Sequence, residues 1–94
     1  MNAIELLRKN EHEIKKRFGI RKIGIFGSFA RGEEKEESDI DILVEFQDNY
    51  KTFDNYMDLK FSLEDLFGRK IDLITIDALR PQLKDGILQE VIYA

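Results

Sequence analysis

Residues 22–46 read KIGIFGSFARGEEKEESDIDILVEF, and this stretch decides the fold because a glycine turn separates two strands of different character. Lys22 to Phe26 is short and mostly apolar, which is typical of a buried strand. Gly27-Ser28 interrupts that pattern, and residues 29–37 are too polar to be buried, so we expect a short helical turn and an exposed loop. Asp39 to Phe46 alternates and predicts a second strand, with Ile40, Ile42, Val44 and Phe46 on one face and Asp39, Asp41, Leu43 and Glu45 on the other.

Helical patterns and one further strand surround this stretch. Asn2 to Phe18 is amphipathic, with Asn2 as its cap and Gly19 as its stop, and Asn55 to Phe67 repeats apolar residues at helical spacing. Lys70 to Ile76 is rich in β-branched residues and predicts a third strand, and the remainder from Pro81 suits a terminal helix. The order of elements predicts an α/β (α+β) fold in which helices pack on a small sheet.

Composition excludes several classes of function. A chain of 94 residues is one domain's worth, and a net charge of -4 with a pI near 5.0 argues against a broad surface for nucleic acid or anionic membranes. The sequence has no cysteine and one histidine, His12, so disulfides, thiolate chemistry and a zinc site are not expected. Neither a signal peptide nor an apolar run of about 18 residues is visible, so we expect a cytoplasmic protein that does not enter a membrane.

Paired acids on the second strand are the first sign of chemistry. The strand period places Asp39 and Asp41 on one face, with Cα atoms about 6.6 Å apart. Two charges at that distance repel by roughly 2.5 kcal/mol at an effective dielectric constant near 20. Hard divalent cations neutralise such a pair, and Mg²⁺ in particular binds through one or two carboxylates together with substrate phosphates.

Asp72 adds a third carboxylate within an otherwise apolar strand, where a buried and unpaired charge would be costly. If that strand lies beside the Asp39 to Phe46 strand, the three carboxylates can meet on one face. Three acids can hold two metal ions about 3.5 to 4 Å apart, the arrangement that stabilises the entering and leaving oxygens in phosphoryl or nucleotidyl transfer.

The turn between the first two strands suits a phosphate. Gly27 lets the backbone approach closely, Ser28 can donate a hydrogen bond, and a helix start supplies unpaired N–H groups. Arg31, about one helical turn later, can add charge-assisted hydrogen bonds to the same anion. Together with the acids, these residues predict a site for a nucleoside triphosphate and its metal ions.

The combined motif resembles a known family. Gly27-Ser28-x-x-Arg31-Gly32, followed by Ser38-Asp39-x-Asp41 and a later lone strand aspartate, is similar to the signature of the polymerase-β-type nucleotidyltransferases. The short length, the opening helix and the Arg80-Pro81 ending are most similar to the minimal nucleotidyltransferases, or MNT domain family. The resemblance covers essentially the whole chain and implies one domain over residues 1–94, with a small mixed sheet flanked by helices.

The same resemblance implies an activity and a partner. It implies two sets of site residues, Asp39, Asp41 and Asp72 as metal-binding and catalytic carboxylates and Gly27, Ser28 and Arg31 as the nucleotide-binding group. Asp72 would also be the base toward the acceptor hydroxyl. Members of the family are commonly encoded beside a helical HEPN protein and act as the antitoxin of that pair, and some transfer AMP from ATP onto a tyrosine of the toxin. The short chain leaves little room for an acceptor site, which also favours a protein acceptor.

Other interpretations of these residues remain open. Arg31 can pair with the acidic run Glu33 to Glu37 instead of a phosphate, and Asp72 can face water or pair with Arg69 or Lys70. At the level of function, the alternatives are a non-catalytic module that neutralises a toxin by covering it, and a nucleotidyltransferase that acts on a small molecule. Aromatic residues near loops and the C-terminus are compatible with a partner surface.

Overall fold

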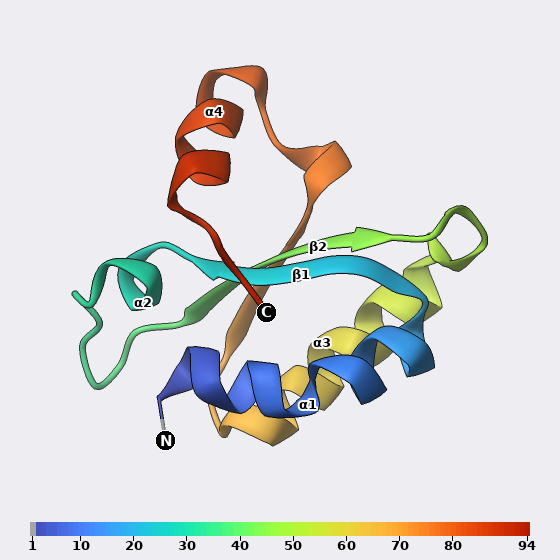
Figure 1. Cartoon of the computed structure of the whole chain (residues 1–94), viewed down its shortest axis with the longest axis horizontal. Helices are drawn as coiled ribbons and strands as arrows, with labels where there is room; N and C mark the ends of the chain where they lie inside the picture. The colour runs from blue at the N-terminus through green and yellow to red at the C-terminus, as the bar shows by residue number, and fades with distance from the viewer. Residues whose placement is uncertain (1) are drawn as a thin grey trace.

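A single mixed sheet lies between helices in the computed structural model, which describes residues 2–94 (Figure 1). The elements, in chain order, are α1 (Ala3–Phe18), β1 (Ile20–Phe26), α2 (Ser28–Arg31), β2 (Ile40–Phe46), α3 (Phe53–Phe67), β3 (Ile71–Thr75), α4 (Pro81–Glu90) and β4 (Ile92–Tyr93). Two short 3-10 turns, Asp48–Tyr50 and Ile76–Ala78, follow β2 and β3. The predicted fold class, a small sheet flanked by helices, is confirmed.

The strand order in the sheet is β3-β2-β1-β4. β1 pairs antiparallel with both β2 and β4, whereas β2 and β3 run parallel. Parallel strands need a crossover connection, and α3 provides it between β2 and β3. The sheet is therefore mixed, and the two strands that carry the predicted carboxylates are neighbours.

The hydrophobic core lies on one side of the sheet. Figure 1 shows α1 and α3 together on that side and α4 on the other. From β2, the residues Ile40, Ile42, Val44 and Phe46 join the core cluster with the fully buried Leu7, Leu59 and Leu63 of the two helices. The alternation predicted for this strand is confirmed, because Asp41 and Glu45 lie on the opposite face and are only partly buried.

Local sequence signals account for the ends of the long helices. The Asn2 side chain accepts a hydrogen bond from the Glu5 backbone N–H at 2.9 Å, which satisfies one of the free donors at the start of α1. Thr52 caps α3 in the same way, by accepting from Asn55 N–H at 3.1 Å, so this helix begins at Phe53 rather than at the predicted Asn55. Gly19 ends α1 as predicted, with a φ of 65°.

The end of the chain differs from the prediction. The helix that begins at Pro81 stops at Glu90, Val91 is extended, and β4 pairs with Gly24 and Ile25 of β1. A Cβ atom on Gly24 would lie 2.8 Å from the Ile92 carbonyl oxygen, so the glycine permits the approach of β4. The helical spacing of apolar residues concealed this strand because a two-residue strand has no period of its own.

Four strand boundaries also differ by one or two residues. β1 begins at Ile20 instead of Lys22, because Ile20 is buried and pairs with Phe46. β2 begins at Ile40, so Asp39 lies one residue outside it, and β3 spans Ile71–Thr75 instead of the predicted 70–76. Within residues 2–94, no helix is long and apolar enough to cross a membrane.

Candidate nucleotide and metal site

Asp41 and Asp72 are brought together by the sheet. They are register partners on the parallel strands β2 and β3. Residues paired in this way point to the same face, with neighbouring strands about 4.8 Å apart. That face is the one away from the core, and the condition set by the sequence, that the two strands be neighbours, is met.

Burial distinguishes the three carboxylates. Asp39 and Asp72 are exposed, whereas Asp41 is partly buried. Burial, together with the nearby charges of Asp72 and Asp39, raises the pKa of Asp41 from its ordinary 3.8 to about 6, against a smaller opposing effect of Arg31. Asp41 is thus the partly desolvated acid, and Asp72 faces water, as one interpretation of the sequence held.

Gly27 brings the turn after β1 against the Asp41 carboxylate. Its backbone has φ 72° and ψ -150°, a conformation that is essentially restricted to glycine. A Cβ atom at this position would also overlap Asp41 Oδ2, so two independent constraints require a glycine. The turn therefore lies directly beside the carboxylate pair.

Ser28 opens α2, a helix of four residues, and is partly buried there. The Gly27 carbonyl oxygen accepts hydrogen bonds from Ala30 N–H at 3.0 Å and Arg31 N–H at 3.1 Å. A single turn has little macrodipole, so what this turn can offer an anion is individual N–H and hydroxyl groups rather than a helix end.

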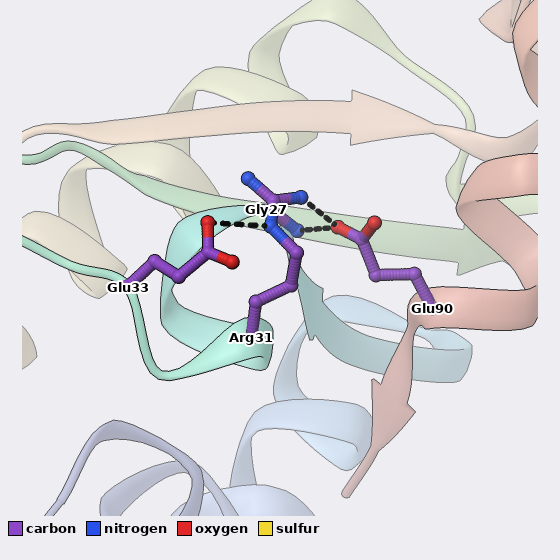
Figure 2. A network of polar contacts seen from close by, with 4 residues as sticks. All are labelled: Gly27, Arg31, Glu33 and Glu90. Atoms are coloured by element: carbon purple, nitrogen blue, oxygen red, sulfur yellow. Dashed lines mark hydrogen bonds and ion pairs between the residues drawn. The ribbon is translucent and has the colours of Figure 1, made fainter.

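Arg31 is held by two carboxylates (Figure 2). Its Nε donates to Glu33 Oε2 at 3.2 Å, and its Nη1 donates to Glu90 Oε1 at 2.9 Å. The hydrogen bond to Glu33 raises the pKa of Arg31 most, and the hydrogen bond to Glu90 and the negative charge of Glu90 raise it further. Arg31 thus pairs with the acidic run through Glu33, as the alternative interpretation held. It also pairs with Glu90, which lies outside that run.

Glu90 is the site residue that sequence reasoning missed. The same Glu90 oxygen also accepts a hydrogen bond from the Gly27 backbone N–H. Nothing in the local pattern of α4 marks Glu90, which is one of two acids on this helix. Only the pairing of β4 with β1, itself unpredicted, brings the end of α4 next to Gly27.

Asp72 does not take the partners suggested for it. Arg69, one of these, donates instead to the carbonyl oxygens of Glu36 at 2.6 Å and Ser38 at 3.2 Å. These bonds tie the start of β3 to the loop that leads into β2. Arg69 thereby helps to hold the segment that carries Asp39, and Asp72 stays exposed on the outer face.

The donor set fits Mg²⁺ only in part before a nucleotide binds. Within residues 2–94, no three Asp, Glu or His side chains are already placed to share one ion. Two in-register carboxylates are present, however, and Mg²⁺ commonly takes one or two carboxylates and completes its octahedron with water and substrate phosphates. The residues therefore suit an ion that arrives with a triphosphate rather than a closed, all-protein metal site.

A hollow of about 530 Å³ lies on the β3 side of the sheet. Its lining is mostly apolar and includes Phe53, Leu73, Ile74 and Tyr56, whose hydroxyl donates to the Leu73 carbonyl oxygen at 2.6 Å. Burial, and in second place the charge of Asp72, raises the pKa of Tyr56. Leu73, the residue after Asp72 along β3, belongs to this lining, and Asp72 does not.

Comparison with known proteins shows the family of this chain. A family profile described as a nucleotidyltransferase domain matches residues 7–94. The chain belongs to the nucleotidyltransferase domain family. Among its relatives is the protein adenylyltransferase MntA of Thermococcus cleftensis, which is 40% identical over 88 residues, 94% of this chain and 88% of that protein.

Solved structures extend the likeness to the fold of this nucleotidyltransferase domain. A structure described as a candidate minimal nucleotidyltransferase superposes with a TM-score of 0.80 at 36% identity, over 98% of this chain and 95% of the other. A second, of a tri-AMPylated Shewanella oneidensis HEPN toxin in complex with its MNT antitoxin, superposes with a TM-score of 0.69 at 17% identity, over 97% and 71% of the two chains. At that identity the second comparison supports the fold alone.

Proposed function

We propose that this nucleotidyltransferase transfers AMP from ATP, with Mg²⁺, to a tyrosine hydroxyl of a HEPN-type toxin and so acts as its antitoxin. The observation that carries the proposal is the in-register pair Asp41 and Asp72 beside the Gly27 turn. Carboxylates next to a glycine turn offer places for the metal ions and for the phosphates that they accompany. The name of the Thermococcus relative supplies the adenylyl group as the one transferred.

The proposed reaction is a displacement at the α-phosphorus of ATP. The tyrosine oxygen forms a bond to that phosphorus, the bond from it to the bridging oxygen of the β-phosphate breaks, and pyrophosphate leaves. The hydroxyl proton passes to a carboxylate, for which Asp72 is the candidate because it is the exposed member of the pair. Mg²⁺, held by Asp39, Asp41 and Asp72, would neutralise charge on the phosphates during this displacement.

The remaining site residues would bind and orient the donor. Gly27 and Ser28 present backbone N–H and hydroxyl groups, and Arg31 presents a guanidinium within the same turn. The partly buried Asp41 is held in place by the strand on which it lies and by the turn packed against it. Fixed donors and acceptors of this kind need little rearrangement when charge develops on the phosphates.

The acceptor is proposed to come from another protein. The hollow lined by Phe53, Leu73 and Tyr56 offers an apolar place for an aromatic side chain, and Leu73 follows Asp72 on β3. Phe53 in this lining is 76% exposed, so an incoming side chain could contact it. The complex of a tri-AMPylated HEPN toxin with an MNT antitoxin shows that this fold can accompany such a modification in another protein.

Labelled ATP tests the proposal directly. The chain is incubated with Mg²⁺, α-labelled ATP and the HEPN-type protein encoded nearest to it, and label on that protein is followed. Wild type should transfer label, and Asp39→Asn and Asp72→Asn should each reduce the rate at least about 100-fold. Asp65→Asn, which removes an exposed carboxylate on α3, is the matched control and should retain the wild-type rate. Equal labelling by all four proteins would reject the catalytic role.

The same variants separate catalysis from simple covering of the toxin. Under the proposal, Asp39→Asn should still bind the HEPN-type protein but no longer suppress its toxicity. Suppression that survives in the variant, with no label transferred, would instead support the non-catalytic module. Transfer of AMP to small hydroxyl compounds and not to the protein would favour the small-molecule alternative.

A further inference from the structure

The Glu90 carboxylate occupies the group of donors that the proposed function assigns to a phosphate. One oxygen, Oε1, accepts both from Gly27 N–H and from Arg31 Nη1 (Figure 2). A carboxylate that accepts from a backbone N–H and a guanidinium makes the charge-assisted bonds that a phosphate oxygen would make there. The chain therefore places one of its own anions on its anion-binding groups.

The contact is made by an element that can move away. Glu90 is the last residue of α4, and this helix contains no buried residue. Its Leu83 side chain is 56% exposed, and the strand that follows has two residues. Segments with few buried apolar contacts open at low cost compared with the core, so α4 can release its carboxylate without unfolding the sheet.

Charge prevents Glu90 and a triphosphate from sharing these donors. Gly27 N–H and Arg31 Nη1 already donate to the Glu90 carboxylate. A phosphate placed at these donors would lie beside that like charge. Glu33 accepts from Arg31 Nε, on the exposed surface, and so does not compete for Gly27 N–H or Arg31 Nη1. A ligand that uses Gly27 N–H and Arg31 must first displace Glu90.

We propose that Glu90 is an internal competitor for nucleotide, a carboxylate that closes the Gly27 and Arg31 donors until a triphosphate displaces it. This inference rests on the proposed function, because it takes these donors to be the place of the triphosphate. The apparent affinity for nucleotide is lowered by the fraction of molecules in which Glu90 is bound. Ligands with more phosphate charge displace it better, so the device favours ATP over AMP.

Nucleotide binding to three proteins tests this. AMP-PNP with Mg²⁺ is titrated by calorimetry into the wild type, Glu90→Gln and Glu33→Gln. Glu90→Gln keeps the shape of the side chain and removes its charge, and should bind AMP-PNP about threefold to tenfold more tightly. Glu33→Gln removes the same charge from a carboxylate that contacts the same guanidinium, but Gly27 N–H still donates to Glu90. The affinity of this variant for AMP-PNP should stay within about twofold of wild type.

Each outcome of the titration has a distinct meaning. An affinity of Glu90→Gln equal to or weaker than wild type overturns the inference, and so does equal tightening by both variants, because a general change of charge would then suffice. Absence of AMP-PNP binding in all three proteins overturns the proposed function and this inference with it. When wild type binds AMP-PNP, either of the first two results overturns the inference alone and leaves the proposed function standing.

A second measurement needs no nucleotide. The Gly27 amide proton is observed by NMR in the ligand-free wild type and in Glu90→Ala, which removes the acceptor altogether. Loss of the hydrogen bond should move this resonance upfield, with the core amides unchanged, and should raise the affinity for AMP-PNP at least as much as Glu90→Gln does. An unmoved Gly27 resonance in a folded Glu90→Ala protein would show that the contact is absent and would overturn the inference.

Discussion

The two faces of the sheet use the same strands for opposite purposes. On one face, alternate residues of β2 join a closed hydrophobic core under α1 and α3. On the other, the residues between them include Asp41, in register with Asp72, and this face carries the helix α4, none of whose own residues is buried. Leu43 is fully buried on this second face but does not belong to the core cluster.

This difference shows where stability and chemistry lie in the molecule. Apolar burial on the helical face supplies the free energy of folding, at roughly 25 cal/mol for each Å² removed from water. The opposite face holds like charges together, which opposes folding, and depends on a turn that glycine alone adopts without strain. A site of this kind can exist because the other face stabilises the strands that carry it.

The largest effect on stability should follow from the same substitution made on the two sides. Leu63→Ala removes a fully buried side chain from the core and should lower the free energy of unfolding by about 3 kcal/mol. Leu83→Ala, on the exposed surface of α4, should change it by less than about 0.5 kcal/mol. Chemical denaturation measures both. Similar losses for the two variants would mean that α4 is packed as firmly as the core helices.

Two glycines with positive φ allow the cost of backbone conformation to be distinguished from the effect of position in the site. Gly68, at the end of α3, has φ 65° and open space around it, so Gly68→Ala should cost about 1 kcal/mol from backbone strain alone. Gly27→Ala adds overlap with Asp41 to a conformation restricted to glycine, and should cost about 2 kcal/mol or more and abolish nucleotide binding. Equal costs in denaturation, with nucleotide binding intact in both, would remove Gly27 from the site.

A smaller effect should appear in the pH dependence of stability without metal. Asp41 has a pKa of about 6 in the folded protein against an ordinary 3.8, so the folded state keeps a proton that the unfolded state has released. Its contribution to the free energy of unfolding should therefore fall between about pH 4 and 6 and then level off. Because solvent screens this partly exposed group, the fall should be about 1 kcal/mol.

The contribution of Asp41 to the pH dependence is obtained from the difference in free energy of unfolding between two proteins. Wild type and Asp41→Asn are denatured in EDTA across this pH range, and the stability of the wild type relative to the variant should decline as pH rises. A constant difference would mean that the carboxylates are farther apart or better solvated than the sheet register indicates.

The strand that carries Asp41 could be predicted because its pattern is local and its period is two. The alternation from Ile40 to Phe46 identified both faces correctly, and the caps at Asn2 and Gly19 were visible because a cap lies within one turn of the residue it serves. The pairing of Asp41 with Asp72 needed one further assumption, that their strands are neighbours. The sheet meets that condition.

The contact of Glu90 with Gly27 could not be predicted in this way. It depends on β4, whose two residues continue an apolar helical spacing and give no separate signal. The different burial of Asp41 and Asp72 could not be predicted either, because each has an apolar neighbour on both sides along the chain and only Asp72 lies on the edge strand. The degree of burial of a strand residue is set by the elements that cover it, which lie elsewhere in the sequence.

One variant tests most directly whether the carboxylate face gives up stability for chemistry. Asp41→Asn is compared with wild type at pH 7.5, by thermal unfolding in EDTA and by transfer of label from ATP to the HEPN-type protein in Mg²⁺. We expect the thermal unfolding midpoint of Asp41→Asn to be higher by about 5 °C, because a gain of about 1 kcal/mol in stability has that effect in a domain of this size. We expect its transfer rate to be at least about 100-fold lower. A variant that is less stable than wild type, or one that transfers AMP at the wild-type rate, would contradict this account.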